Sequence, residues 1–128
     1  MTNRFELYKC SICGNVIEIL VSGDGHPVCC GEEMEKLENK NDTKNSPELT
    51  KTHTPVIETD GRERIISVPN HPMSKEHHIV FLQSISNDKT EACIKFLQPE
   101  EKTVMKNCSD TNKIHARSYC NIHGVYIS

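Results

Sequence analysis

The sequence of 128 residues contains no tryptophan, only 5% aromatic residues and no excess of positive charge. Fifteen Lys and Arg residues stand against 18 Asp and Glu residues, and no basic cluster is interleaved with aromatic side chains. Proteins that bind nucleic acid or a membrane surface depend on such clusters. The composition therefore excludes both classes of partner.

Long apolar runs are also missing. The longest run, VIEILV at 16–21, is far shorter than a membrane-spanning helix. The first residues, MTNRFELYK, are charged and lack the apolar stretch of an export signal. We therefore expect a soluble protein located in the cytoplasm.

The seven cysteines and seven histidines are unevenly distributed. Four of the cysteines lie in the first 30 residues together with only one histidine, and six of the seven histidines lie at position 53 or later. In a reducing compartment, paired cysteine spacings indicate metal binding rather than a disulfide framework. The distribution predicts two metal sites of different chemistry.

The polar segment ENKNDTKNSPELTKT divides the chain. It covers 38–52, is nearly devoid of apolar side chains and is rich in Asn, Thr and charge, which is typical of a linker. We expect a small module at 1–37 and a larger domain at 53–128. A module of that size has too few residues for a sufficient core, so a bound metal must stabilise it.

The larger domain alternates β-type runs with turn signals. The turns include Asp60-Gly61 and the stretch SNDKT. Prolines and β-branched residues disfavour long helices throughout this region. The pattern predicts an all-β chain whose larger domain is a β-sandwich. The predicted strands are HTPVIE, RIISVP, HHIVFLQSI, EACIKFL, VMKN and ARSYC.

The first predicted metal site consists of four thiols. Cys10 and Cys13 form a CxxC step followed by Gly14, and the adjacent Cys29 and Cys30 come fifteen residues later. Neighbouring side chains on an extended backbone point to opposite sides, so the backbone must twist for both sulfurs to reach one ion. The spacing suits a structural zinc site or an iron site, with zinc favoured on spacing alone and a disulfide the weakest alternative.

The second predicted metal site includes Cys120 and His123, a CxxH step that needs further ligands. Strand alternation places His77 and His78 on opposite faces of a run that is apolar on both, so periodicity does not choose between them. The histidines that remain as candidates are His53, His71, His77, His78 and His115.

The stretches FELYKCSICGNVIEIL and VCCGEEM resemble desulforedoxin and the N-terminal domain of desulfoferrodoxin. The adjacent cysteine pair is the unusual part of this match, which covers about 36 residues. The resemblance implies a mononuclear iron at the four cysteines, in a module that carries electrons and forms a dimer. Zinc remains the alternative metal there.

The segments HTPVIE, HPMSKEHHI and ARSYCNIHG resemble, in order and spacing, the three iron-binding segments of superoxide reductase. This resemblance implies an immunoglobulin-like β-sandwich with a second iron. The implied ligands of that iron are His53, His71, His77, Cys120 and His123. The residues left without a metal role are His26, His78 and His115, together with Cys93 and Cys108 as ordinary thiols.

The implied activity is the one-electron reduction of superoxide to hydrogen peroxide without release of oxygen. Four neutral imidazoles and one thiolate leave one position of the iron open for a small anion, and the N–H groups of Ile122 and His123 are placed to tune the thiolate. The implied electron donor is a rubredoxin-like protein or a flavoprotein. The alternative is a two-iron electron carrier or redox sensor without turnover.

The chain departs from the family in front of the first histidine ligand, where most members have a Glu-Lys pair. Here the two positions are Lys51 and Thr52, and the nearest carboxylate is that of Glu48. We expect Lys51 and Lys75 to supply the positive charge that attracts the anion or delivers protons. Their alternative role is that of solvated surface charges.

Overall fold

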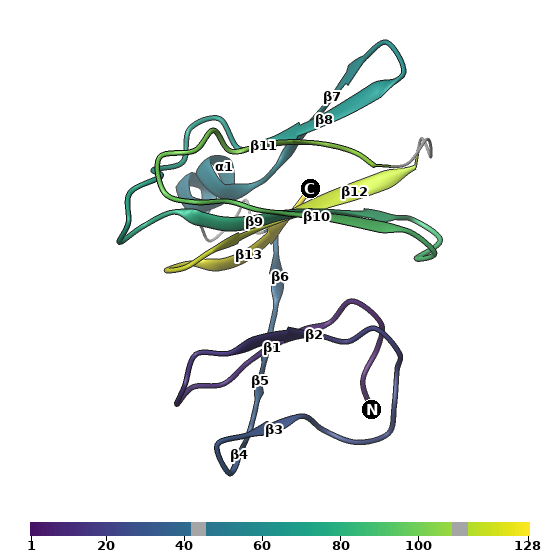
Figure 1. The fold of residues 1–128 in the computed structure, drawn as a ribbon, viewed down its shortest axis with the longest axis vertical. Helices are drawn as coiled ribbons and strands as arrows, with labels where there is room; N and C mark the ends of the chain where they lie inside the picture. The colour runs from purple at the N-terminus through teal and green to yellow at the C-terminus, as the bar shows by residue number, and fades with distance from the viewer. Residues whose placement is uncertain (42–45, 109–112) are drawn as a thin grey trace. The chain divides into compact units, whose positions relative to one another are not determined.

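A computed structural model of the chain describes residues 1–41, 46–108 and 113–128. The chain divides into two compact units, Met1–Glu38 and Asn39–Ser128, each with its own sheets (Figure 1). Strands form nearly all of the regular structure, which confirms the expected all-β class. Within these ranges no helix is long and apolar enough to cross a membrane.

The N-terminal unit is built on a three-stranded antiparallel sheet. Strand β1 (Leu7–Lys9) lies between β2 (Val16–Glu18) and β5 (Glu35–Leu37). A second pair of very short strands, β3 (Val28–Cys29) and β4 (Glu32–Glu33), carries the adjacent cysteines. Both cysteine pairs therefore lie at chain reversals beside these strands.

The core of the N-terminal unit is very small. Its main buried cluster consists of Tyr8, Cys10 and Met34, against which Ile19 and Cys29 pack. Two of these five residues are cysteines of the predicted metal site. Because units of this size rarely fold on apolar burial alone, an ion bound by the four cysteines would add to the stability of this unit.

The C-terminal unit contains a five-stranded sheet and a three-stranded sheet. The five-stranded sheet has the order β10 (Ala92–Phe96), β9 (Ile79–Ser86), β12 (Ile114–Cys120), β13 (Gly124–Ile127) and β6 (Asn39–Lys40). The three-stranded sheet has the order β11 (Val104–Lys106), β8 (Glu63–Ser67) and β7 (Val56–Asp60).

One apolar core joins the two sheets of the C-terminal unit. Leu82 of β9 and Ala116 of β12 are fully buried in the same cluster as Ile66 of β8 and Met105 of β11. Side chains from facing sheets that share one core define a β-sandwich. The sandwich predicted from the alternating runs is therefore present.

Residues 38–52, expected as a linker, contain regular structure. Strand β6 pairs in parallel with β13, and helix α1 spans Pro47–His53. Pro47 occupies the first turn, where its missing N–H costs nothing, and Pro55 favours an extended conformation for Thr54, which ends the helix. The remaining residues of this segment include 42–45, which lie outside the described residues.

Cys93 and Cys108 are joined by a disulfide, so the expectation that they are ordinary thiols is wrong. Cys93 lies on β10, the edge strand of the larger sheet, and Cys108 follows β11, the edge strand of the smaller one. The sequence separates them by 15 residues. Only the packing of the two sheets brings their edges together.

The sandwich core is expected to carry most of the stability of the C-terminal unit. Leu82→Ala should lower the free energy of unfolding by about 2–5 kcal/mol, because it leaves a cavity at a fully buried position. Ile94→Ala on the neighbouring strand, 44% exposed, should change it by only about 0.5 kcal/mol. Urea unfolding followed by circular dichroism measures both. Equal losses would contradict this assignment of the core.

Candidate metal centres

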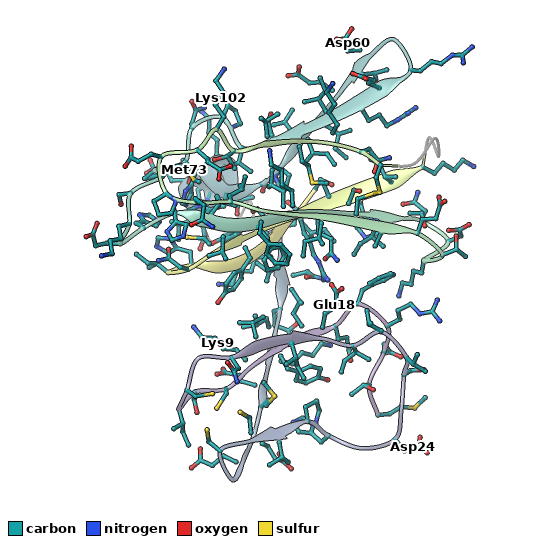
Figure 2. All side chains as sticks on the ribbon, in the orientation of Figure 1. Lys9, Glu18, Asp24, Asp60, Met73 and Lys102 are labelled. Carbon is teal, nitrogen blue, oxygen red and sulfur yellow. A yellow bond between two sulfur atoms is a disulfide. The ribbon has the colours of Figure 1, made fainter. Side chains whose placement is uncertain are left out.

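The first candidate centre gathers four thiols in the N-terminal unit. The Sγ atoms of Cys10, Cys13, Cys29 and Cys30 all lie within 4.8 Å of one another, and those of Cys13 and Cys29 are 3.5 Å apart. Figure 2 shows sulfur atoms of this unit gathered beside β3 and β4. One ion of tetrahedral preference fits among four sulfurs at this spacing.

The CxxC step forms a tight turn around one sulfur. The N–H of Cys13 donates to Sγ of Cys10 at 3.4 Å, and the N–H of Gly14 donates to the carbonyl of Cys10 at 3.0 Å. Gly14 has a φ of +82°, which a residue without Cβ adopts at no steric cost. The turn therefore presents both thiols on one side.

The adjacent cysteines reach the same point because the backbone twists sharply between them. Cys30 has a φ of +53°, in the left-handed region, and Gly31 follows at +77°. A side chain with a Cβ is uncommon in that region. The twist expected from the sequence is confirmed at Cys30. It turns the Cys30 side chain, which would otherwise point away, toward the other three sulfurs.

The ionisation of all four thiols requires a cation. The amide N–H groups of Cys13 and Ile12 lower the pKa of Cys10 to about 6, which favours its thiolate. The neighbouring thiols of Cys13 and Cys10 raise the pKa of Cys29 to about 12, and Cys13 also raises that of Cys30. Four thiolates are therefore ionised together only when a positive ion lies among them.

The second candidate centre lies in the C-terminal unit and draws ligands from three parts of the chain. His53 is the last residue of α1, His71 and His77 flank a turn before β9, and Cys120 ends β12. His123 follows in the turn before β13. The possible ligand atoms of His53, His71, His77 and Cys120 lie within 4.8 Å of one another, and Nδ1 of His123 lies 3.1 Å from Nε2 of His53.

The four imidazoles form a ring of near-perpendicular neighbours. Following the order His53, His71, His77 and His123, neighbouring ring centroids are 4.4, 4.7, 5.2 and 4.8 Å apart, and the diagonal from His53 to His77 is 6.3 Å. The two rings on that diagonal are inclined by only 32°, whereas neighbours are inclined by 63–83°. Four ligands around the equator of one ion have this arrangement.

Hydrogen bonds fix the protonation of two of these rings. Nδ1 of His53 lies 2.7 Å from the carbonyl of Leu49, and Nδ1 of His71 lies 2.6 Å from the carbonyl of Pro72. Because a carbonyl only accepts, each Nδ1 carries the proton and each Nε2 is left with a lone pair. Burial lowers the pKa of His53 to about 4 and also lowers that of His71, so neither ring gains a second proton near neutral pH.

The unprotonated nitrogens then face one another. Nε2 of His53 and Nε2 of His71 are 3.0 Å apart, and two lone pairs at that distance repel. Two nitrogen ligands bound at right angles to one ion at usual lengths lie about 3 Å apart. A buried cation between the rings therefore fits both the spacing and the chemistry of this cluster.

His77 supplies an independent sign of a missing partner. Its Nε2 is buried and has no hydrogen-bond partner among the described residues. A short turn holds the residue, with its N–H donating to Oγ of Ser74 at 3.1 Å and its carbonyl accepting from the N–H of Ser74 at 3.0 Å. A buried ring nitrogen without a partner is costly, and a metal ion in this cluster satisfies it.

Cys120 places its sulfur in the apolar interior. The side chain is fully buried in the sandwich core, and the register of β12 against β9 shifts between Tyr119 and Cys120. Such irregularities re-aim a side chain at the end of a strand. The N–H of His123 donates to Sγ of Cys120 at 3.4 Å, so one of the two expected amide donors is in place.

Asn121 holds two of the ligand-bearing loops together, a role that sequence reasoning missed. Its Oδ1 accepts from the N–H of His78 at 3.0 Å, and its Nδ2 donates to the carbonyl of Glu76 at 2.9 Å. These bonds join the loop of His77 to the loop of Cys120. The signal was in the sequence, because Asn121 lies inside the CNIHG motif.

Lys40 and Tyr126 also surround the centre and were not predicted. Nζ of Lys40 donates to the carbonyl of His123 at 2.7 Å and lies 5.6 Å from the ring centroid of Tyr126. The Tyr126 ring lies 4.7 Å from that of His53. Burial first, and then the charges of His77 and Lys40, lower the pKa of His123. No local signal links Lys40 to a residue 83 positions away.

The predicted lysines lie on exposed positions near the ligands in sequence. Lys51 lies in α1 two residues before His53, a spacing that puts the two side chains on different faces of the helix. Lys75 lies in the turn between His71 and His77. Glu48 is exposed in the first turn of α1, and in the described part of the chain no carboxylate joins either ligand cluster.

The three histidines set aside by the sequence lie outside both clusters as the structure describes them. Nε2 of His26 lies 3.0 Å from the carbonyl of Met34, and Nδ1 of His115 lies 3.3 Å from Oδ1 of Asn87. His78 follows His77 directly, and its buried Nδ1 has no hydrogen-bond partner among the described residues.

Known proteins match both halves of the chain in order. A family model described as the N-terminal domain of desulfoferrodoxin matches residues 2–37, and one described as desulfoferrodoxin matches residues 44–128. A desulfoferrodoxin homolog of Archaeoglobus fulgidus is 34% identical over 132 residues, which cover 100% of this chain and 99% of that protein. Desulforedoxin of Megalodesulfovibrio gigas is 50% identical over 36 residues, which cover 28% of this chain and 97% of that protein.

The fold has a close counterpart among solved structures. The crystal structure of the superoxide reductase from Treponema pallidum superposes with a TM-score of 0.74 and covers 96% of both chains. The sequence identity is 19%. The likeness therefore concerns the fold, including its two-unit organisation.

The choice between adjacent histidines gives a direct test of the second centre. His77→Ala should lower the metal content by about one ion per chain, because it removes a ring whose buried nitrogen faces the cluster. His78→Ala is the matched control and should keep both ions, since the bond of His78 to Asn121 uses its backbone N–H. Metal analysis of purified protein measures the ratio. Loss of iron in the His78 variant alone would reverse the assignment.

Proposed function

Because the chain belongs to the desulfoferrodoxin family, we propose that it is a superoxide reductase, which reduces superoxide to hydrogen peroxide without releasing oxygen. The observation that carries the proposal is the ring of four imidazoles beside the buried sulfur of Cys120, with unprotonated nitrogens facing one another. We propose that His53, His71, His77, His123 and Cys120 bind the catalytic iron.

Iron bound by these donors would supply the single electron that superoxide takes up. Burial keeps the rings of His53 and His71 neutral as the pH falls below the usual range of histidine, and the carbonyl hydrogen bonds to Nδ1 leave Nε2 of each ring free to bind the ion. The amide N–H of His123 lowers the electron density on Sγ of Cys120. Such contacts tune the reduction potential of a thiolate-bound metal.

An accessible position for the substrate distinguishes this proposal from its main alternative. A carrier or sensor would close the site with a sixth protein ligand, whereas an enzyme needs one position free. The second ligand cluster contains four histidines and one thiol, and among the described residues no carboxylate joins it. The donor set thus supports turnover with a small anion rather than electron transfer alone.

Positive charge near the site is needed because superoxide is an anion. We retain Lys51 and Lys75 as proposed sources of that charge or of protons, and we add Lys40 from the structure. Its ammonium group lies 2.7 Å from the carbonyl of His123, and its charge contributes to the lowered pKa of that ring. The field of Lys40 therefore reaches a proposed ligand directly.

We propose that the four thiols of the N-terminal unit bind a second mononuclear iron, with zinc as the alternative metal. Four-thiolate sites suit both ions. An iron at this position would receive an electron from a rubredoxin-like protein or a flavoprotein. We also propose a homodimer located in the cytoplasm as the working form.

Mixing the reduced protein with pulses of superoxide tests the reaction. The expected result is oxidation of the histidine-bound iron, formation of one peroxide per superoxide consumed, and no evolution of oxygen. Release of oxygen would identify a dismutase, and the absence of any reaction would favour the electron carrier. Metal analysis and the visible spectrum of the ferric thiolate sites establish beforehand that iron is loaded.

The charge proposal predicts specific losses of rate. Lys40→Ala should lower the second-order rate constant with superoxide about threefold to tenfold and flatten its dependence on ionic strength, because attraction of the anion is lost. Lys40→Arg should restore both. Lys95→Ala is the matched control, since Lys95, on the edge strand β10, also donates to a backbone carbonyl, that of Val104, at 3.2 Å.

The same measurement includes Lys51→Ala and Lys75→Ala. If all three alanine variants keep the rate and the salt dependence of the unaltered protein, the proposal that a lysine attracts superoxide is wrong. These lysines would then be solvated surface charges without a part in the reaction.

A further inference from the structure

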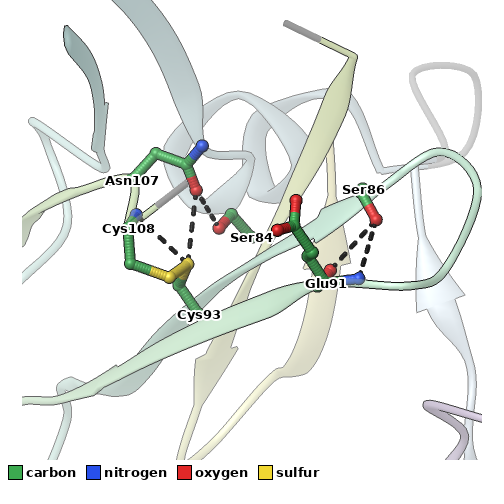
Figure 3. The surroundings of a disulfide bond; sticks show 6 residues. All are labelled: Ser84, Ser86, Glu91, Cys93, Asn107 and Cys108. Atoms are coloured by element: carbon green, nitrogen blue, oxygen red, sulfur yellow. Dashed lines mark hydrogen bonds between the residues drawn. A yellow bond between two sulfur atoms is a disulfide. The ribbon is translucent and has the colours of Figure 1, made fainter. Parts of the chain in front are cut away.

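The disulfide between Cys93 and Cys108 belongs to neither metal centre. It joins the edge strand β10 of the larger sheet to the segment after the edge strand β11 of the smaller sheet (Figure 3). The two Cα atoms are 5.9 Å apart, a separation at which a disulfide forms without movement of the backbone. The bond therefore fastens the two layers of the sandwich at their edges.

Hydrogen bonds hold the two cysteines in place independently of the bond between their sulfurs. The N–H of Asn107 donates to the carbonyl of Arg64 on β8 at 2.8 Å. Figure 3 shows the second bond, in which Oγ of Ser84 on β9 donates to Oδ1 of Asn107 at 2.7 Å. The N–H of Cys108 lies 3.1 Å from Sγ of Cys93 and points toward it. The reduced thiols are thus preorganised side by side.

The two sulfurs differ in their access to solvent. Cys93 is 8% exposed and packs in the sandwich core, whereas Cys108 is an exposed residue. Oδ1 of Asn107 lies 3.5 Å from Sγ of Cys93 and accepts a hydrogen bond from the S–H group when that residue is a thiol. A dissolved oxidant or a reducing protein therefore reaches the sulfur of Cys108 first.

We infer that Cys93 and Cys108 form a reversible oxidation site, which hydrogen peroxide closes and a dithiol reductant opens. The source of the peroxide rests on the proposed function, since it is the product of superoxide reduction. Disulfides in a reducing compartment are usually transient and are used in catalysis or redox sensing. The oxidation state of the pair would then depend on the concentration of peroxide around the protein.

The chemistry balances in two steps. The thiolate of Cys108 attacks one oxygen of hydrogen peroxide, the O–O bond breaks, and a sulfenic acid and hydroxide form. Sγ of Cys93 then attacks the sulfur of that sulfenic acid, the S–S bond forms, and water leaves. Two thiols and one peroxide thus give one disulfide and two waters. A dithiol reduces the disulfide by attacking the accessible sulfur of Cys108. The dithiol itself becomes a disulfide, and the two cysteines become thiols again.

Closing the pair stabilises the sandwich because it restricts the unfolded chain. A loop of 15 residues predicts that the oxidised form melts about 10 °C or more above the reduced form. Peroxide would therefore convert the sandwich to its more stable, oxidised form. The double variant Cys93→Ser, Cys108→Ser should show no such dependence on reductant, which separates this effect from changes at the metal centres.

Peptide mapping of the metal-loaded protein tests the inference. Trypsin releases the two cysteines in separate peptides, 90–95 and 107–113, neither of which contains another cysteine. The protein is treated anaerobically with dithiothreitol, desalted, exposed to about one equivalent of hydrogen peroxide and alkylated. The expected result is two alkylated peptides before peroxide and one cross-linked pair after it, with a second dithiothreitol treatment restoring the two peptides.

Single variants test the order of attack. Cys93→Ser should accumulate a sulfenic acid on Cys108 that dimedone traps, whereas Cys108→Ser should leave Cys93 largely unmodified because it is buried. A folded protein whose pair resists dithiothreitol, fails to close with peroxide or reacts first at Cys93 would overturn the inference.

Added peroxide also separates this inference from the proposed function. If added peroxide closes the pair and superoxide pulses produce no peroxide, the oxidation site stands and the superoxide reductase proposal falls. If the pulses produce peroxide and added peroxide does not close the pair, the reverse holds.

Discussion

The repulsion between unprotonated ring nitrogens is the constraint on which the larger centre depends. Nε2 of His53 and Nε2 of His71 face one another at 3.0 Å because the carbonyls of Leu49 and Pro72 hold the proton on the opposite nitrogen of each ring. Only a cation between them makes this arrangement favourable. A metal ion bound there would therefore stabilise helix α1 and the turn before β9.

The four-thiol centre meets the same constraint with sulfur instead of nitrogen. Its thiolates are ionised together only around a cation, and Cys30 adopts a left-handed backbone conformation to bring its sulfur to the others. The two units differ in what else stabilises them. The C-terminal unit has a core shared by two sheets, whereas the N-terminal core consists largely of the residues next to the metal.

The sandwich carries two separate sulfur sites, Cys120 beside the imidazoles and the disulfide between Cys93 and Cys108. Cys120 ends β12, while Cys93 pairs with Ser84 of β9, which in turn pairs with Ala116, four residues before Cys120 on β12. Four residues of strand span about 13 Å. The thiolate beside the imidazoles and the oxidisable pair are therefore separate sites, and the chemistry proposed for each is open to separate measurement.

The sequence by itself determined the parts of this protein that rest on local pattern. Short alternating runs predicted the strands β7 to β12, because period-two alternation follows from side chains that face a core. The spacings CxxC, CC and CxxH indicated two metal sites, and the resemblance to known iron-binding segments selected His53, His71 and His77 from the five candidate histidines. The strained backbone at Cys30 followed from the adjacency of two cysteines.

Contacts between distant segments were decided by the tertiary structure alone. The pairing of β6 with β13, the bond from Lys40 to the His123 carbonyl and the disulfide across the sheet edges join residues 15 to 86 positions apart. Periodicity also left His77 and His78 equivalent, and only the turn closed by Ser74 aims His77 into the cluster. Local patterns specify which way a side chain faces along its own strand, but the meeting of two loops or two edges depends on how whole sheets pack.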